Sequence, residues 1–193
     1  MAELARRSPL ALVEMSSIPG PEPVTLVELP FQGKLIVRAG VEAREPASAV
    51  LGLELPRLLR TASAADVTAL GLGPDEWLLL TAADRAESLA AALRQACGPA
   101  HHAVVVVSDR MAGIGIAGAR AQDTLCAGCP IDLQPLAFPA EAVTRTLLGK
   151  APIVLLRPTA EPRYAIWVNG SFAPYVWRFL ENAALEHGVA VES

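Results

Sequence analysis

Gly113, Gly115 and Gly118 form a G-x-G-x-x-G, the pattern with which a strand-to-helix turn binds the pyrophosphate of a dinucleotide. In such a site the glycines follow a strand directly, so that backbone N–H groups at a helix start face the anion. Here residues 108–112 separate the glycines from the valines at 104–107. The isoleucines between the glycines alternate with them at the period of a strand. We predict that Gly113 and Gly115 lie inside a strand, approached closely by another backbone or partner, and that Gly118 is a turn. Nucleotide binding is the alternative.

Cys126 and Cys129 form a C-x-x-C, which is typical of a redox disulfide or of half a zinc site. Zinc needs about four ligands, and Cys97 and the three histidines show no second pair at ligand spacing. A redox cysteine stands at a helix N-terminus, which lowers its thiol pKa, whereas this pair falls at the end of an expected helix. We predict two small apolar side chains packed near a turn, with redox or metal chemistry as the alternative.

The remaining polar candidates show no catalytic arrangement. His101 and His102 are adjacent at the start of a strand, so their side chains point to opposite faces and cannot share one ion. Asp109 follows the valine strand as turn material, and Ser108 and Ser171 lack a nucleophile elbow or a paired histidine. We therefore predict no catalytic, cofactor-binding or metal-binding residue in this chain.

Composition favours a protein that meets other proteins. Of the 193 residues 52% are hydrophobic and 19% are charged, against about a quarter charged in an average domain. The net charge of −4 and the lack of a basic cluster exclude a nucleic-acid partner. Pro, Gly or a charge interrupts every apolar run well before the length of about 20 residues that a membrane span requires. Three cysteines without a disulfide spacing suit a reducing compartment, so we expect a cytoplasmic protein.

The hydrophobic pattern predicts an α+β fold of antiparallel sheets with packed helices, in two fused lobes. Residues 1–23, rich in proline, are expected to form an extended N-terminal arm, and residues 24–193 a single α+β unit. The strands 67–72 and 77–81 are expected to form a hairpin around Gly73-Pro74. The other expected strands are 31–38, 104–107, 111–117, 143–148, 153–157 and 164–168, and the expected helices are 46–53, 84–97, 119–127 and 171–187.

Capping residues set the expected ends of two helices. Asp84 with Glu87 resembles a capping box, and Gly98 suits the residue after the helix. Ser171 is the expected N-cap of the last helix, and Gly188 its stop. All three tryptophans lie in apolar periodic segments, so we expect them in the core: Trp77, Trp167 and Trp177.

Several runs along most of the chain carry a family resemblance. They are 7–10 (RSPL), 72–79 (LGPDEWLL), 118–121 (GARA), 128–133 (GCPIDL) and 171–173 (SFA) with Tyr175, Trp177 and Leu180. On these runs the chain resembles the gamma subunit of bacterial heterotetrameric sarcosine oxidase. The Pro-Asp-Glu-Trp run and the Ser-Phe-Ala…Trp helix are specific only in combination.

The resemblance implies a fold like that of the folate-dependent aminomethyltransferase, the T-protein of glycine cleavage. In that family an acidic pair precedes a hairpin and an Asn-Ala follows its second strand. The corresponding positions here are Ala65-Asp66 and Thr81-Ala82, so one acid and the asparagine are missing. The resemblance therefore implies no cofactor bound by this chain alone.

The family relation also implies a role. The chain would be a non-catalytic partner of alpha, beta and delta subunits, which would hold FAD, FMN, NAD, folate and zinc. That complex would oxidise sarcosine to glycine with O2, giving H2O2 and 5,10-methylenetetrahydrofolate. Two alternatives stay open: a stand-alone folate-binding module with Asp66 at the edge of its pocket, and the matching subunit of another N-methyl-amino-acid oxidase or dehydrogenase.

Overall fold

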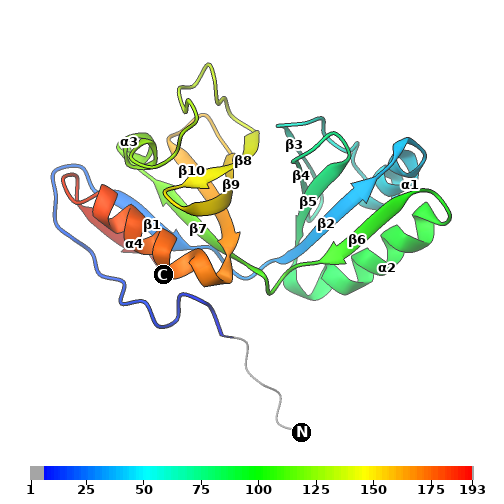
Figure 1. Ribbon diagram of the computed structural model, residues 1–193, viewed down its shortest axis with the longest axis horizontal. Helices are drawn as coiled ribbons and strands as arrows, with labels where there is room; N and C mark the ends of the chain where they lie inside the picture. Colours follow the sequence, from blue (N-terminus) through cyan, green and yellow to red (C-terminus); the bar gives the residue numbers. More distant parts are fainter. Residues whose placement is uncertain (1–6, 193) are drawn as a thin grey trace, which may run out of the picture.

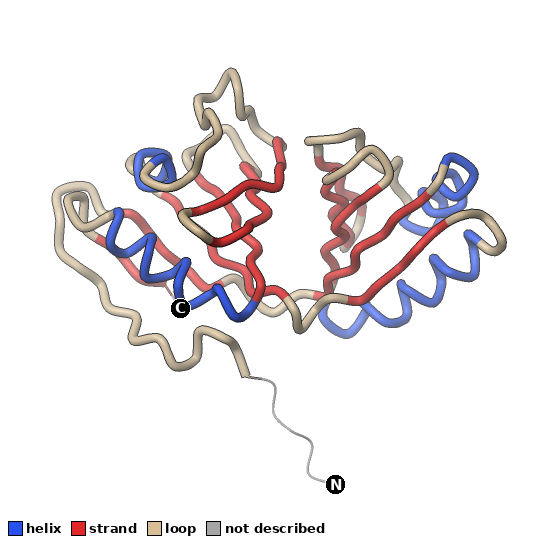
Figure 2. The backbone as a smooth tube through the Cα atoms, viewed as in Figure 1, coloured by secondary structure: helices blue, strands red, loops and turns tan. Residues whose placement is uncertain are grey.

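Two sheets, each with helices packed against it, form two lobes that lie side by side (Figure 1). This computed structural model describes residues 7–192, so residues 1–6 of the expected arm and Ser193 lie outside the described residues. The tube in Figure 2 shows the helices on the outer sides of the lobes and the two sheets facing each other across the middle. The predicted class, α+β with antiparallel sheets and packed helices, is confirmed.

The first lobe contains a five-stranded antiparallel sheet in the order β3-β4-β5-β2-β6. Thr68 pairs with Leu80 and Gly71 with Trp77, so the predicted hairpin is confirmed. The short edge strand β3 was not predicted, because its sequence Thr-Ala-Ser-Ala has no large apolar side chain. The strands are β2 (Gly33–Ala39), β3 (Thr61–Ala64), β4 (Val67–Gly71), β5 (Glu76–Thr81) and β6 (His102–Val106).

Two helices, α1 (Val41–Leu51) and α2 (Ala86–Cys97), pack on one face of this sheet. Helix α1 starts before the predicted residue 46, and Pro46 lies inside it. Because proline has no backbone N–H, one helical hydrogen bond is missing there. Three buried side chains on one face nevertheless pack the helix against the sheet: Ala43, Ala47 and Leu51.

The predicted cap of α2 is wrong in its detail. Residues Ala83–Arg85 form a 3₁₀ turn, and Arg85 is the N-cap with no capping side-chain hydrogen bond. The predicted end is confirmed, since Gly98 has a φ of +49° and its N–H donates to the Arg94 carbonyl at 3.1 Å.

The second lobe contains a six-stranded sheet in the order β11-β1-β7-β10-β9-β8. All pairs are antiparallel except β1 with β11. Neither of those two strands was predicted. Because β1 precedes the first lobe in the chain and pairs with β7 behind it, the first lobe is an insertion into the second. The strands are β1 (Val24–Glu28), β7 (Met111–Ala117), β8 (Ala142–Leu148), β9 (Ala151–Arg157), β10 (Arg163–Asn169) and β11 (Val189–Glu192).

Helices α3 (Ala121–Cys126) and α4 (Ala173–Ala183) belong to the second lobe and are shorter than predicted. Ser171 does not cap α4, because residues 170–172 form a 3₁₀ turn and Phe172 is the N-cap. Gly188 has a φ of +93° but lies beyond the helix end, after a turn.

The described part of the N-terminal arm packs against the second lobe. Leu10 is fully buried in that lobe's core. Ile18 and Val189 form an antiparallel bridge, with N···O distances of 2.7 and 2.8 Å. The Ser8 hydroxyl donates to the Glu28 carboxylate. The arm therefore adds side chains to the core and backbone pairing to the sheet edge.

A buried cluster joins the two lobes. It contains Leu70, Leu72, Leu78 and Leu80 from the first lobe and Val143, Val154, Leu156 and Trp167 from the second. Backbone contacts add to it: Arg60 bridges Ala142, and the Val143 N–H donates to the Leu59 carbonyl at 3.3 Å. All three tryptophans are at most 3% exposed, so their predicted core positions are confirmed.

Tyr164 provides a test of the second core. Its hydroxyl is buried and, among the described residues, has no hydrogen-bond partner. Burial raises the pKa of Tyr164, against the lowering effect of Arg157. We expect Tyr164→Phe to leave the unfolding free energy unchanged at pH 7 or to raise it by about 1–3 kcal/mol, because it removes an unsatisfied group.

The same variant carries a pH signature. An unfolded tyrosine ionises near pH 10, whereas the folded Tyr164 keeps its proton to higher pH, so its share of stability is lost as pH rises above about 10. Urea unfolding at pH 7 and at about pH 11 should show a smaller alkaline loss in Tyr164→Phe than in wild type. If wild type and Tyr164→Phe lost the same stability at alkaline pH, the raised pKa of Tyr164 would be contradicted.

Candidate functional site

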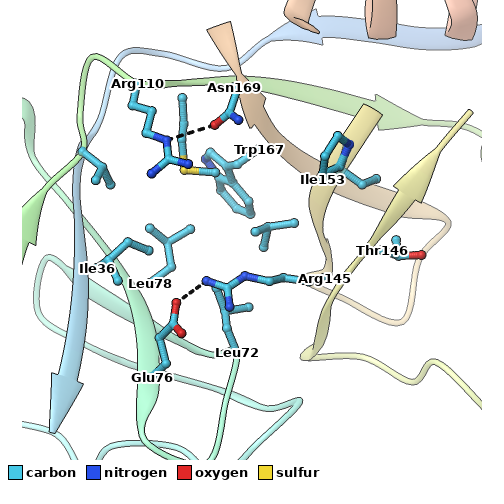
Figure 3. A pocket seen from close by; sticks show the side chains of 14 residues that line it. Ile36, Leu72, Glu76, Leu78, Arg110, Arg145, Thr146, Ile153, Trp167 and Asn169 are labelled. Atoms are coloured by element: carbon cyan, nitrogen blue, oxygen red, sulfur yellow. Dashed lines mark hydrogen bonds and ion pairs between the residues drawn. The ribbon is translucent and has the colours of Figure 1, made fainter. Parts of the chain in front are cut away.

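A pocket of about 390 Å³ lies where the two lobes face each other (Figure 3). Its walls are mostly apolar: Ile36, Leu72, Leu78, Val107, Met111, Pro152, Ile153, Val154 and Trp167. Both sheets direct apolar side chains toward the space between the lobes. These side chains leave a gap near the segment that connects β6 to β7, and this gap is the pocket. Its volume falls within the usual range for a small-molecule site.

Two guanidinium groups stand on opposite sides of this pocket. The Arg110 Nε donates to the Asn169 side-chain oxygen at 3.2 Å. Arg145 from β8 pairs with the Glu76 carboxylate from β5, so this ion pair crosses between the lobes (Figure 3). Sequence patterns do not reveal this group of residues, because its members come from distant segments and no local spacing connects them.

The polar groups that line the pocket are two arginines, one threonine, one asparagine and one ion-paired carboxylate. Its lining residues include no His, Cys, Ser or Lys, and its one carboxylate, Glu76, is ion-paired. The two arginines could hold an organic anion above an apolar floor. Acid–base catalysis requires a proton-transferring group near the reacting atoms, and the carboxylate among the lining residues, Glu76, is engaged by Arg145.

The space beside the glycine motif is filled by side chains of β1 and of the residue that follows it. Gly113 and Gly115 lie within β7, as predicted, and Gly118 forms a turn with a φ of +114°. A Cβ on Gly115 would lie 2.6 Å from Cγ1 of Val27, and one on Gly113 would lie 2.9 Å from Cβ of Leu29. The space that a pyrophosphate would need at these glycines is therefore occupied by two side chains of this chain.

A pair of substitutions tests this packing. We expect Gly115→Ala to lower the unfolding free energy by about 1–3 kcal/mol, because the new methyl group overlaps Val27. In a Val27→Ala background the same change should cost well under half as much, which a double-mutant cycle in urea would measure.

The same chain offers a direct check on nucleotide binding. NAD at millimolar concentration should leave the melting temperature of wild type unchanged. A rise in melting temperature that Gly115→Ala abolishes would instead support a nucleotide site.

The C-x-x-C pair does not lie at a helix N-terminus. Cys126 is the last residue of α3 and is exposed, whereas Cys129 is buried, so the predicted packing holds only for Cys129. The pKa of the Cys126 thiol is raised, mainly by partial burial and also by the nearby Cys129 and two aspartates. A redox cysteine requires the opposite shift. Burial also raises the pKa of Cys97.

The other polar candidates, Ser108, His101 and His102, do not line the pocket between the lobes. Ser108 is buried, and its hydroxyl accepts the Lys34 backbone N–H at 3.0 Å. His102 lies 2.7 Å from the Ala100 carbonyl through its Nδ1, and His101 is exposed just before β6. Within residues 7–192 no group of three or more His, Cys, Asp or Glu side chains could hold a metal ion.

Asp66 and Thr81, the positions compared with the folate-dependent family, do meet in the structure. The Thr81 hydroxyl donates to the Asp66 carboxylate at 3.3 Å, and Arg85 pairs with the same oxygen. Partial desolvation raises the pKa of Asp66, but Arg85 and Thr81 outweigh it and hold the pKa below its ordinary value. Asp66 does not line the pocket between the lobes, which lies toward the other end of β5.

No helix among the described residues is long and apolar enough to cross a membrane.

Sequence comparisons identify relatives over most of the chain. Residues 41–186 match the sarcosine oxidase gamma subunit family. The sarcosine oxidase gamma subunit of Arthrobacter sp. is 32% identical over 167 residues, which cover 84% of this chain and 81% of that protein. The gamma subunit of Corynebacterium sp. (strain P-1) has the same identity and coverage.

Two solved structures resemble the fold. A chain of the heterotetrameric sarcosine oxidase from Corynebacterium sp. U-96, solved in complex with pyrrole 2-carboxylate, superposes with a TM-score of 0.83 at 28% identity. The match covers 97% of this chain and 98% of that one. The glycine cleavage aminomethyltransferase T from Bartonella henselae gives a TM-score of 0.66 at 16% identity, over 88% of this chain and 47% of that protein, and so shares the fold.

Proposed function

Because this chain belongs to the sarcosine oxidase gamma subunit family, we propose that it is the non-catalytic gamma subunit of a heterotetrameric sarcosine oxidase. The observation that carries the proposal is the match along almost the whole length of both chains with a component of such a complex. Because the match covers 97% of this chain and 98% of that one, the similarity extends over nearly the whole of that subunit and not only a fragment of it.

The site geometry supports the non-catalytic part of this proposal. The pocket between the lobes has no His, Cys, Ser or Lys among its lining residues, and Asp66 is engaged by Arg85 and Thr81. The glycine motif is filled by Val27 and Leu29. We propose that this chain has no catalytic, cofactor-binding or metal-binding residue and acts by packing against the other subunits.

The reaction would then belong to the complex. With its alpha, beta and delta subunits it would convert sarcosine, tetrahydrofolate and O2 into glycine, 5,10-methylenetetrahydrofolate and H2O2. FAD, FMN, NAD, folate and zinc would be held by those other subunits. We further propose that the complex works in the cytoplasm, and that residues 24–193 act as one unit with residues 1–23 as its arm.

Co-expression tests the proposal. We expect a tagged form of this chain, produced together with alpha, beta and delta subunits of a sarcosine oxidase, to co-purify with flavin-containing subunits and with sarcosine-dependent H2O2 production. Arg110→Gln and Arg145→Gln should change kcat less than about twofold, because neither residue contacts reacting atoms in this proposal. A well-behaved monomer that ignores the flavoprotein subunits would overturn it.

Two further readouts separate the alternatives. Activity of the complex against a panel of N-methyl amino acids, with sarcosine as reference, would identify a related oxidase or dehydrogenase. Calorimetry of the isolated chain with tetrahydrofolate should give no binding heat at millimolar ligand. Measurable heat would support the stand-alone folate module instead.

A further inference from the structure

An apolar surface is exposed where the loops of the two lobes meet. It is formed by residues 57–60 of the first lobe and residues 131–144 of the second, and we call it the junction surface. Leu58 and Leu59 are each 47% exposed, and Leu136, in the long loop after α3, is fully exposed. Between the two segments lies a groove of about 420 Å³, with Ile131, Phe138 and Val143 among its lining residues. A single large apolar side chain and its neighbours would fit a groove of this size.

Positive charge without internal partners flanks this apolar patch. The sequence of residues 57–60 is Arg-Leu-Leu-Arg, and both arginines line the groove. Neither guanidinium makes an ion pair or hydrogen bond within residues 7–192, whereas Arg38, Arg85 and Arg145 each pair with a carboxylate. Asp132, the one acid lining the groove, accepts the Gln134 backbone N–H at 2.9 Å. The groove lining therefore carries two arginines against one acid, Asp132, and the exposed Glu141 lies in the same loop segment but outside the groove lining.

The backbone presents these side chains in a fixed conformation. Leu59 has a φ of +63° and Glu141 a φ of +62°, which side-chain-bearing residues rarely adopt. Both are held: the Leu59 N–H donates to the Gly71 carbonyl at 2.9 Å, and the Glu141 N–H to the Arg157 carbonyl at 2.7 Å. The Leu59 carbonyl also accepts the Val143 N–H from the other lobe. Strain maintained by surrounding structure in this way is characteristic of functional surfaces.

We propose that the junction surface is the docking site for a segment of another subunit of the complex. An apolar side chain of that segment enters the groove, and a flanking Asp or Glu pairs with Arg57 or Arg60. This inference rests on the proposed function. Two arginines on a chain with a net charge of −4 do not provide the extended basic surface that a nucleic acid requires, and so the occupant is a protein.

Substitutions in the co-expressed complex test the site. We expect Leu58→Asp and Leu136→Asp each to lower the yield of complex captured by the tagged chain by about tenfold or more, because an apolar anchor is replaced by a charge. Arg57→Glu should lower it by a similar factor and Arg57→Lys much less. All three positions are exposed, and circular dichroism of each full chain should match wild type.

Matched controls lie elsewhere on the surface. Leu185→Asp changes a leucine that is 54% exposed after α4, and Lys150→Glu reverses a charge at the β8–β9 turn. Both controls should assemble as wild type does. If wild type assembles and the junction variants assemble equally well, the docking site is overturned while the proposed function stands. If wild type itself ignores the other subunits, the proposed function fails, and the docking site with it.

Photo-crosslinking identifies the occupant. With p-benzoylphenylalanine in place of Leu136, ultraviolet light should link this chain to another subunit, at a peptide that carries an apolar residue beside Asp or Glu. Crosslinks only to a second copy of this chain, or to a basic peptide, would overturn the proposal.

Discussion

A Trp177→Ala variant loses about 4–6 kcal/mol of unfolding free energy, which is the largest effect that we expect from a single side chain here. Trp177 lies on α4 and is fully buried in the second core. Its ring N–H donates to the Glu181 carboxylate at 2.8 Å, and Glu181 is itself buried. The substitution opens a large cavity and also removes a hydrogen bond from a buried charge. The stability of a domain is about 5–15 kcal/mol in total, so this variant should be close to unfolding.

Urea unfolding followed by circular dichroism measures this loss, and the yield of assembled complex should fall with it. Trp177→Phe is the matched control, since it keeps a six-membered aromatic ring and removes the hydrogen bond together with the smaller part of the indole. It should cost about 2 kcal/mol. If both variants lost the same free energy, the bond to Glu181 and not the packing would be the dominant contribution, contrary to our expectation.

A Gly188→Ala variant loses about 3 kcal/mol, because the N-terminal arm crosses the chain at this point. Gly188 has a φ of +93°, and a Cβ on it would lie 2.6 Å from the backbone nitrogen of Gly20. Backbone atoms cannot move aside as the end of a side chain can. The methyl group would therefore push the arm off the lobe and disturb the bridge between Ile18 and Val189.

Gly52→Ala separates the two causes of this loss. Gly52 also has a positive φ, +67°, but nothing lies within 4 Å of its added Cβ. It should cost only about 1 kcal/mol, the effect of backbone strain alone. Thermal unfolding measures both variants, and limited proteolysis should cut residues 7–20 faster in Gly188→Ala. Equal stability losses in the two variants would show that the contact with the arm contributes nothing.

The strands and helices with strong local periodicity were predictable from the sequence. Strand β7 matches its predicted range, and the β4–β5 hairpin has the predicted partners. Their alternating apolar side chains and turn residues act over a few positions, so the sequence contains the necessary information. Helix starts were predicted less well. Asp84 and Ser171 have suitable side chains, but each lies in a 3₁₀ turn outside the helix that it was expected to cap.

The glycine motif shows what sequence spacing can establish about a site. The distance from the valines to Gly113 already indicated a strand in place of a nucleotide-binding turn. Which side chains pack against Gly113 and Gly115 could not be predicted, because Val27 and Leu29 lie more than eighty residues earlier in the chain. The pocket lined by Arg110 and Arg145 was unpredictable for the same reason.

The sequence by itself determined the α+β class, most of the strands, the buried tryptophans and, through runs such as Pro-Asp-Glu-Trp, the family. Only the tertiary structure decided that β1 and β11 pair in parallel, that the arm completes the second lobe, and that the Arg-Leu-Leu-Arg segment meets the loop after α3. Local patterns report on neighbours along the chain. Pairings between distant segments depend on which surfaces bury each other, and the chain must fold before that is defined.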